Sequence, residues 1–280
     1  MDLSAHYLGL NLRNPLVASA SPRASSVDGV RRLARGGVAA VVLPSLFEEE
    51  LHSEVAHDAA LLQAGTDSFP ESLSYFPDIA GAEPGPRWYL SLVERAVATV
   101  DVPVIASLNA ITAGGWVRYA SALENAGAAA IELNIYHLPD DALTSGREME
   151  QRHIDVLTSV KAAVSIPVAV KLSPYYSSMG EMARRFDQAG ADGLVLFNRF
   201  LHPDIDPETL TTTTGLGLLS SPAEGRLPRT WIAHLAGRLR ASLAGSTGVE
   251  DVADVAAYLL AGADVVMATS SLLRHGPDQD

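Results

Sequence analysis

One phrase is repeated along this chain, and it constrains the fold more than any other feature. Each copy combines a helical end, a glycine and a short apolar run that stops on a polar residue: GGVAAVVLPS (36–45), NAGAAAIELN (125–134), QAGADGLVLFN (188–198) and LAGADVVMATS (260–270). The glycine lets a helix end, and the aliphatic run is typical of a strand buried on both faces. In parallel α/β proteins the polar residue that ends such a strand lies where ligands bind.

Counting such runs gives eight expected strands, separated by helical stretches and without a linker. The strands outside the four copies are expected at 16–19, 100–109, 164–173 and 239–248. Eight β–α alternations predict the α/β class and a closed (β/α)8 TIM barrel, with a short hairpin before the first strand. Residues 1–280 would then form one domain. An open doubly wound sheet is the alternative.

Three segments depart from a minimal barrel. Residues 46–87 and 199–229 are too long for plain loops and follow the second and sixth strands. Both leave carboxyl ends of strands, so we expect them to fold over the barrel mouth and shape a substrate pocket, although surface decoration is the alternative. Only 271–280 follows the eighth strand, so we expect the closing C-terminal helix to be absent or supplied from elsewhere, such as a neighbouring subunit.

Composition narrows the classes of function. Apolar residues make up 48% of the chain, and its formal net charge of −13 argues against nucleic acid and anionic membranes as partners. No apolar run is long enough to span a bilayer, and the N-terminus lacks the layout of a signal peptide. With no cysteine, the chain cannot form disulfides, thiolate zinc sites or iron–sulfur clusters. We therefore expect a cytoplasmic protein without a metal site.

The opening stretch DLSAHYLGLNLRNPLVASASP (2–22) resembles the start of the dihydroorotate dehydrogenase family. Further matches follow in order: IELN (131–134), PVAVKLSPYY (167–176), VLFN (195–198), AGSTGV (244–249) and MATSSLLRHG (267–276). The chain is most similar to the divergent branch called dihydroorotate dehydrogenase-like proteins. The resemblance implies an FMN-dependent barrel, a small-molecule substrate and a homodimer. The cofactor ligands predicted at or near strand ends, and for Ser221 in the segment after the sixth strand, are Ala18, Ser19, Ser45, Asn109, Asn134, Lys171, Asn198, Ser221, Gly245, Ser246, Gly248, Thr269 and Ser270.

Lys171 ends the fifth strand inside the apolar phrase VAVKLSP. A lysine that points into a barrel needs an anionic partner or must lose its charge. Beside a flavin, a cation near N1 and C2=O would stabilise the anionic reduced ring, and the matching lysine of the family does this. A structural salt bridge with Glu132 is one alternative, and a Schiff-base lysine is another.

Asparagines end three strands, and small hydroxyl residues end two others. The amides of Asn109, Asn134 and Asn198 offer both donors and acceptors, which suits a flavin pyrimidine edge or an imide-like substrate. The resemblance implies that Asn134 and Asn198 also contact the substrate, whereas turn capping is the plain alternative. The strand ends at 244–248 and 268–271 predict a phosphate site, since barrels often bind phosphate there. The family usually has two adjacent glycines where this chain has Thr247 before Gly248.

Other positions depart from dihydroorotate dehydrogenases. Their loop after the fourth strand carries a Cys or Ser base, whereas this chain reads Asn-Ile-Tyr-His-Leu-Pro with His137 at that place. An imidazole with an ordinary pKa of about 6.5 suits proton abstraction. Tyr136 is a second acid–base candidate, and lining the pocket is the alternative for both. Pro44 replaces a lysine, and 46–87 shows no counterpart of the family's asparagine-containing loop.

The sequence thus predicts an FMN-dependent oxidoreductase that acts on a C–C bond of a small, cyclic substrate other than dihydroorotate. Hydride would move between a substrate carbon and flavin N5, with His137 handling the proton and Lys171 stabilising the reduced ring. A Schiff-base lyase using Lys171 and a flavin-free barrel that serves as a partner subunit are the alternatives.

Overall fold

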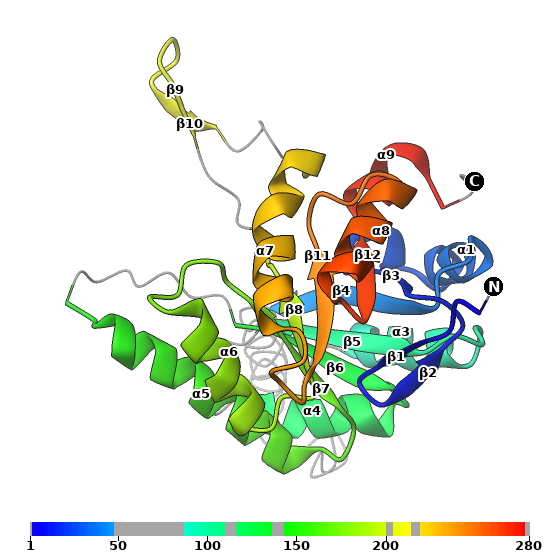
Figure 1. Cartoon of the computed structure of the whole chain (residues 1–280). Coiled ribbons are helices and arrows are strands. Elements are labelled where there is room, and N and C mark those ends of the chain that lie inside the picture. Colours follow the sequence, from blue (N-terminus) through cyan, green and yellow to red (C-terminus); the bar gives the residue numbers. More distant parts are fainter. Residues whose placement is uncertain are drawn as a thin grey trace, which may run out of the picture.

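A computed structural model describes residues 2–47, 87–109, 116–135, 143–199, 204–213 and 219–277. Eight parallel strands close into a barrel with helices around it (Figure 1). Around the barrel the strands run in the order β11 (Ser242–Ser246), β12 (Val265–Ala268), β3 (Leu16–Ala18), β4 (Ala40–Phe47), β5 (Val104–Asn109), β6 (Ala130–Asn134), β7 (Val168–Leu172) and β8 (Gly193–Leu196). The predicted (β/α)8 barrel is confirmed.

The helices lie on the outside of the barrel. They are α1 (Val27–Arg35), α3 (Arg87–Val97), α4 (Trp116–Asn125), α5 (Gly146–Ala163), α6 (Met179–Gln188), α7 (Arg226–Leu235), α8 (Val252–Ala261) and α9 (Ser270–His275). Local sequence sets several of their ends. Asp251 caps α8 by accepting from the backbone N–H of Ala253 and Asp254, and Gly262 ends it at a φ of 103°. That left-handed conformation suits glycine, as the repeated phrase predicted.

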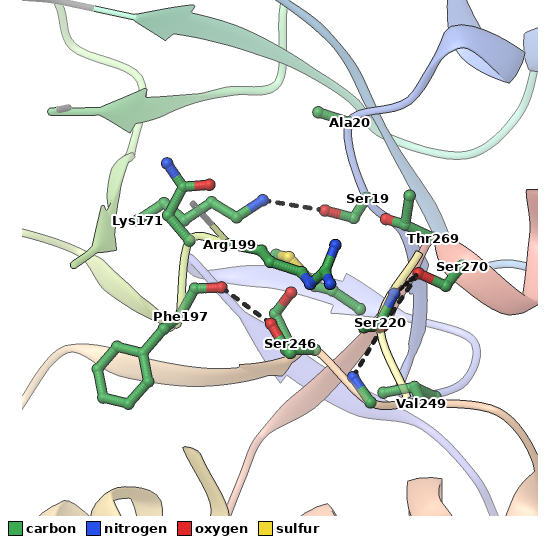
Figure 2. Close-up of a pocket in the computed structure, with 14 residues that line it drawn as sticks. Ser19, Ala20, Lys171, Phe197, Arg199, Ser220, Ser246, Val249, Thr269 and Ser270 are labelled. Carbon is green, nitrogen blue, oxygen red and sulfur yellow. Dashed lines mark hydrogen bonds between the residues drawn. The ribbon is translucent and has the colours of Figure 1, made fainter. Parts of the chain in front are cut away.

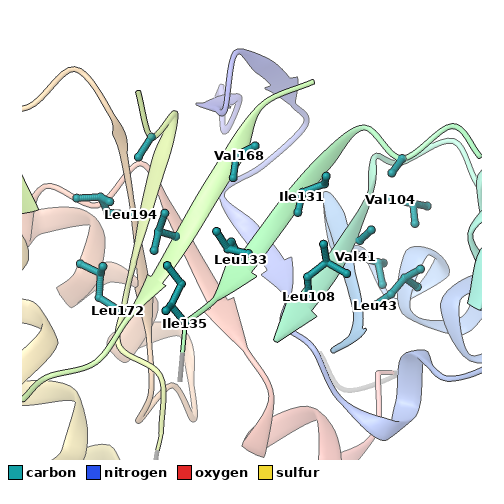
Figure 3. Packing of buried hydrophobic residues seen from close by; sticks show 14 of the residues in the cluster. Val41, Leu43, Val104, Leu108, Ile131, Leu133, Ile135, Val168, Leu172 and Leu194 are labelled. Carbon is teal, nitrogen blue, oxygen red and sulfur yellow. The ribbon is translucent and has the colours of Figure 1, made fainter. Parts of the chain in front are cut away.

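Apolar side chains form two layers of core. Figure 3 shows the outer cluster, where residues such as Val41, Leu133 and Leu172 face the helices. An inner cluster fills the barrel, and its members include Val42, Ala169 and Val195. Strand residues alternate between the two clusters because successive side chains point to opposite faces. The barrel interior is therefore packed, and ligands have access at its ends.

A hairpin closes the amino end of the barrel. Strands β1 (Ala5–Tyr7) and β2 (Leu10–Leu12) pair antiparallel, as the sequence predicted. Tyr7, Leu8 and Leu12 are buried in the inner cluster. With that end plugged, the carboxyl ends of the strands remain as the working face.

The long segment after β8 divides into two parts. Its first part forms the antiparallel pair β9 (Asp204–Asp206) and β10 (Thr211–Thr213), which extends away from the barrel (Figure 1). Ile205 and Leu210 are 73% and 84% exposed, so this hairpin does not cover the mouth, contrary to the expectation for residues 199–229. The second part, around the short helix η2 (Pro222–Gly225), does reach the mouth. Of the other long segment, residues 48–86 lie outside the described part of the chain.

The eighth helix is present but short, which corrects the expectation that it is absent. After β12 the chain forms α9, which has six residues. Beside it, α8 leaves Val252 and Leu260 82% and 89% exposed, and a largely apolar groove of about 860 Å³ lies between the region of α1 and these two helices. Among the described helices, none combines the length and apolar character required to cross a membrane.

Candidate functional site

A cavity of about 280 Å³ opens at the carboxyl ends of five strands (Figure 2). Its walls come from residues at or just after β3, β7, β8, β11 and β12 and from the chain before η2. The lining residues are Ser19, Ala20, Lys171, Phe197, Asn198, Arg199, Ser220, Ser246, Thr247, Gly248, Val249, Met267, Thr269 and Ser270. The barrel thus gathers residues that are up to about 250 positions apart in the sequence.

The turn after β11 approaches the chain around η2 closely. Gly248 has a φ of 69°, and a Cβ on it would lie 2.6 Å from the backbone nitrogen of Gly225. Only glycine fits this approach. Gly248, which the sequence predicts as a cofactor ligand, is therefore required at this position for a steric reason.

Thr247 takes a backbone conformation that glycine usually adopts. Its φ is 80°, which is a genuine outlier for a β-branched residue. Its hydroxyl donates to the carbonyl oxygen of Phe197 at 3.2 Å. The buried Tyr258 hydroxyl lies 2.8 Å from the carbonyl oxygen of Ser246 and 2.6 Å from that of Thr247. These contacts hold the turn in a strained form at the cavity wall, where functional sites often store strain.

Serine hydroxyls connect the chain before η2 to the start of α9. The hydroxyl oxygens of Ser220 and Ser270 are 2.9 Å apart, and the Ser220 N–H donates to the Ser270 hydroxyl at 2.9 Å. The Gly248 N–H donates to the Ser220 hydroxyl at 3.1 Å. With Ser246 and Thr269, hydroxyl groups from three separate segments line this half of the cavity.

Lys171 lies on the opposite wall, at the inner end of the cavity. Its ammonium donates to the Ser19 hydroxyl at 3.2 Å and lies 3.4 Å from a carboxylate oxygen of Glu132. Lys171 is 9% exposed and Glu132 is fully buried. The ion pair that the sequence suggested as an alternative is therefore present. Since Lys171 also lines the cavity, the same side chain is available to a ligand.

Two of the predicted asparagines lie beside Lys171 in register. Asn109 pairs with Asn134 across β5 and β6, and Asn134 pairs with Lys171 across β6 and β7. Paired residues of neighbouring strands point to the same face. One amide oxygen each of Asn109 and Asn134 is buried without a hydrogen-bond partner among the described residues. Buried polar atoms are normally hydrogen-bonded, so these two oxygens require an explanation, and a polar ligand that binds beside them would provide one.

A compact polar network fills the mouth at β4, β5 and β6. The Asn134 amide donates to the hydroxyls of Ser45 and Ser107 at 3.0 Å each, and these hydroxyls are 2.8 Å apart. Below them, the Tyr89 hydroxyl accepts from the Ser107 N–H at 2.9 Å and donates to the Pro44 carbonyl at 2.8 Å. Ser45 is therefore tied to protein groups, and it is not part of the cavity described above.

The remaining predicted residues divide into four groups. Asn198, Ser19, Ser246, Thr269 and Ser270 line the cavity. Ala18 is buried at the end of β3, and a Cβ on Gly245 would meet the Tyr258 ring, so the lack of a side chain there has a packing reason. Ser221 caps η2, while its neighbour Ser220 reaches the cavity. Tyr136 and His137 lie outside the described residues.

Sequence reasoning missed Arg199 and Ser220. Arg199 directly follows Asn198, and its Nε donates to a Glu224 carboxylate oxygen at 2.8 Å. Partial burial raises the pKa of Glu224, but the hydrogen bonds from Arg199 and Ser221 and the Arg199 charge lower it further, so the net pKa lies below its usual value. Figure 2 shows the Arg199 side chain projecting into the cavity. Its position next to Asn198 was the available signal.

The described residues contain no group of three or more His, Asp and Glu side chains placed to hold a metal ion. The cavity therefore offers one cation in an ion pair with Glu132, a second cation in an ion pair with Glu224, and hydroxyl groups around them. Such a lining suits a ligand that carries an anionic group at one end and hydrogen-bonding edges at the other.

Comparisons with known proteins show which proteins the chain resembles. The family model for dihydroorotate dehydrogenase matches residues 81–279, more than half of the chain. Dihydroorotate dehydrogenase B (NAD(+)), catalytic subunit, of Methanothermobacter thermautotrophicus is 25% identical over 99% of this chain and 89% of its own length. The proteins of the same name from Halalkalibacterium halodurans and Listeria innocua are 32% and 33% identical. Those matches cover 61% and 59% of this chain, and they span less than two thirds of those relatives, 57% and 56% of their lengths.

Proposed function

The chain belongs to the dihydroorotate dehydrogenase family, and we propose that it is an FMN-dependent oxidoreductase acting on a C–C bond of a small, cyclic substrate. The observation that carries the proposal is the cavity at the barrel mouth, where Lys171 lies at one end and a set of hydroxyl groups at the other. A flavin mononucleotide has the matching layout, with a polar ring edge and a phosphate separated by a ribityl chain. The proposed enzyme is a flavin-dependent dehydrogenase of the dihydroorotate dehydrogenase-like kind.

The residues of the cavity fit this cofactor. Ser220, Ser246 and Ser270 offer hydroxyl groups, and the turn at Gly248 brings backbone close to the opening. These are the groups with which barrels hold phosphate after their last two strands. Outside the lining of this cavity, the buried amide oxygens of Asn109 and Asn134, unpartnered among the described residues, offer acceptors for the N–H of a pyrimidine-like edge.

When bound, FMN supplies the electron acceptor for a hydride that leaves a substrate carbon. Lys171 holds a positive charge where negative charge develops, and preorganised charges of this kind are a large catalytic contribution. Glu132 and Ser19 fix the ammonium in place from two sides. Lys171 therefore needs little rearrangement in order to act.

His137 is the proposed base that takes the proton from the substrate, with Tyr136 as the second candidate. Both lie in the loop after β6, outside the described residues, so their placement is part of the proposal. A base with an ordinary pKa of about 6.5 predicts that turnover rises with pH through that value. His137→Asn would abolish this pH step in the rate of flavin reduction, whereas Tyr136→Phe would leave it in place.

Dihydroorotate itself is not the proposed substrate, although the relatives carry its name. Pro44 stands where the family has a lysine. The carbonyl oxygen of Pro44 accepts a hydrogen bond from the Tyr89 hydroxyl. Asn134 directs its amide N–H groups into the network with Ser45 and Ser107. A proline at position 44 offers a ligand neither a charge nor an N–H group.

The test is an anaerobic titration of the purified, flavin-loaded protein. We expect a yellow protein whose released flavin is FMN, and no rapid bleaching on addition of dihydroorotate. Rapid bleaching of the flavin by dihydroorotate would contradict the proposal about the substrate, but it would support the proposal that FMN is the cofactor. A protein that neither contains nor takes up flavin would contradict the proposed function as a whole and favour the flavin-free barrel.

The Schiff-base alternative requires Lys171 as a neutral amine. In the structure the Lys171 amine is instead engaged in an ion pair with the Glu132 carboxylate at 3.4 Å. Borohydride trapping of a substrate on Lys171 would overturn this argument. A homodimer and a cytoplasmic location remain predictions, and light scattering of the purified protein would test the former.

A further inference from the structure

Arg199 places a guanidinium group inside the cavity. It follows Asn198 just after the end of β8, and its side chain lines the cavity together with the hydroxyl residues (Figure 2). In that view it runs from the side of Lys171 toward Ser220 and Ser270. Ser220, Ser246 and Ser270 line the same cavity as Arg199.

Its positive charge distinguishes Arg199 from most of the residues that line the cavity. The chain carries a formal net charge of −13, so its overall field repels a phosphate ester. Lys171 and Arg199 are the only charged residues among those that line the cavity in the described part of the chain. Lys171 is held at the inner end by Ser19 and Glu132. Arg199 is thus the second cation of the cavity lining. Arg274, which is not part of the lining, donates to the Ser220 carbonyl oxygen at 2.8 Å and pairs with Glu250.

Glu224 fixes the orientation of Arg199. Its carboxylate accepts from Arg199 Nε at 2.8 Å, and its other oxygen accepts from the Ser221 N–H at 2.8 Å. The second contact belongs to the capping box of η2, so the carboxylate is tied to the backbone of a short helix. A guanidinium carries five N–H donors in a planar fork, and the contact with Glu224 involves the Nε–H. Held in this way, Arg199 loses less side-chain freedom when a ligand binds.

Hydroxyl groups and backbone N–H groups bind phosphate as neutral donors. They hold a phosphate ester, but they discriminate weakly between it and an uncharged hydroxyl, which also accepts hydrogen bonds. A guanidinium adds charge-assisted, bidentate hydrogen bonds, and these favour the phosphate specifically. A site with Arg199 beside Ser220, Ser246 and Ser270 therefore suits a phosphate monoester.

We propose that Arg199 is the cationic ligand of the FMN phosphate and makes this site select FMN over riboflavin. The inference rests on the proposed function, and it adds a residue and a selectivity to it. Flavin binding by the hydroxyl groups and the turn at Gly248 would occur without Arg199, but with little preference for the phosphorylated form.

The test compares the affinities of two flavins that differ only in the phosphate. Flavin-free full-length protein is titrated with FMN and with riboflavin, and the dissociation constants are measured from the change in flavin fluorescence. The variants are Arg199→Gln, which removes the charge, and Arg199→Lys, which keeps the charge without the planar fork. Arg226→Gln is the matched control, because Arg226 is exposed at the start of α7 and is not among the residues of the cavity.

The expected result is a selective loss. Arg199→Gln weakens FMN binding by about 10-fold to 100-fold, the range for one charge-assisted contact, and changes riboflavin binding by less than about 2-fold. Arg199→Lys falls between the wild type and Arg199→Gln, and Arg226→Gln matches the wild type. The FMN affinity of the wild type also falls more steeply with salt than that of Arg199→Gln.

Four outcomes would overturn the proposal. Equal losses for both flavins in Arg199→Gln would mean that the residue supports the fold, and circular dichroism with Arg199→Lys would confirm it. Unchanged affinities would place any phosphate contact elsewhere, and a gain of FMN affinity would mean that the side chain obstructs the cavity. A wild-type protein that binds neither flavin would overturn the proposed function as well, whereas the first three results leave that function standing.

Discussion

The two sides of the barrel mouth are built differently. The cavity side, at β3, β7, β8, β11 and β12, places hydroxyl groups and two cations around an open space, although the Ser220 and Ser270 hydroxyls also contact each other. The network side, at β4, β5 and β6, turns its hydroxyl and amide N–H groups toward one another. Both sides come from the same kind of strand end, so the repeated phrase alone does not distinguish them.

This difference between the two sides indicates which residues of the mouth serve stability and which serve ligand binding. On the network side, Ser45 and Ser107 satisfy each other and Asn134, and they stabilise the mouth with no ligand. On the cavity side, Thr247 has a strained backbone conformation, and Gly248 approaches Gly225 so closely that only glycine fits. Structure kept at a cost in stability is expected where function requires it. The following predictions use this contrast.

The largest effect is expected at Lys171, on the boundary of the two sides. Lys171→Met leaves the fully buried Glu132 carboxylate without its cation. Removing one partner of a buried ion pair costs about 3–5 kcal/mol in the free energy of unfolding. Denaturant unfolding of the flavin-free protein would measure the loss.

The matched control removes both charges at once. The double variant Glu132→Gln with Lys171→Met should regain at least half of the lost stability, because no isolated charge then remains buried. If Lys171→Met were as stable as the wild type, Glu132 would not depend on this lysine. In that case the ion pair would not explain why a lysine can lie at the end of β7.

A second comparison exchanges one serine from each side. Ser107 is fully buried in the network, so Ser107→Ala should lower the free energy of unfolding by about 1–3 kcal/mol. Ser246 lines the cavity, so Ser246→Ala should change stability by about 0.5 kcal/mol or less and weaken FMN binding instead. If Ser107→Ala and Ser246→Ala changed the free energy of unfolding and the FMN affinity equally, the proposed distinction between the network side and the cavity side would be wrong.

Much of the barrel could be predicted from sequence because its signal is local. A glycine that ends a helix and an aliphatic run act within about ten residues, so each strand is visible on its own. The strand ends then give Lys171, Asn134 and the turn at Gly248 without further information. The hairpin that plugs the amino end was also visible from its position before the first strand.

Long-range contacts explain what could not be predicted. The sequence predicted Ser221 as a ligand residue, but in the structure the hydroxyl of its neighbour Ser220 contacts Ser270, and Ser221 caps η2. Which of the two serines makes this contact depends on how the irregular chain before η2 meets the segment after β12. Gly245 resembles a ligand residue in sequence, but the ring of Tyr258 from α8 packs there. Arg199 resembles any surface arginine until the fold brings Glu224 beside it.

Thr247 allows the strain on the cavity side to be measured. Asparagine tolerates a positive φ better than a β-branched residue and can still donate to the Phe197 carbonyl. Thr247→Asn should therefore raise the free energy of unfolding by about 1 kcal/mol. Thr158→Asn, on the exposed face of α5, is the control and should bring no gain. A loss of stability in Thr247→Asn would show that the threonine packs better than its backbone conformation suggests.

The smallest effect concerns the acid stability of the Arg199–Glu224 pair. The net pKa of Glu224 in the folded protein lies below its usual value, although partial burial opposes this, because Arg199 and Ser221 bond its carboxylate. A depressed pKa adds stability above the ordinary value of about 4.3, and that stability is lost as the pH falls through the folded value. The stability difference between the wild type and Glu224→Gln should therefore shrink as the pH falls below about 4.3. Glu94→Gln on the exposed face of α3 should show no such trend. A difference that stayed constant with pH would mean that the carboxylate charge does not hold Arg199 in the cavity.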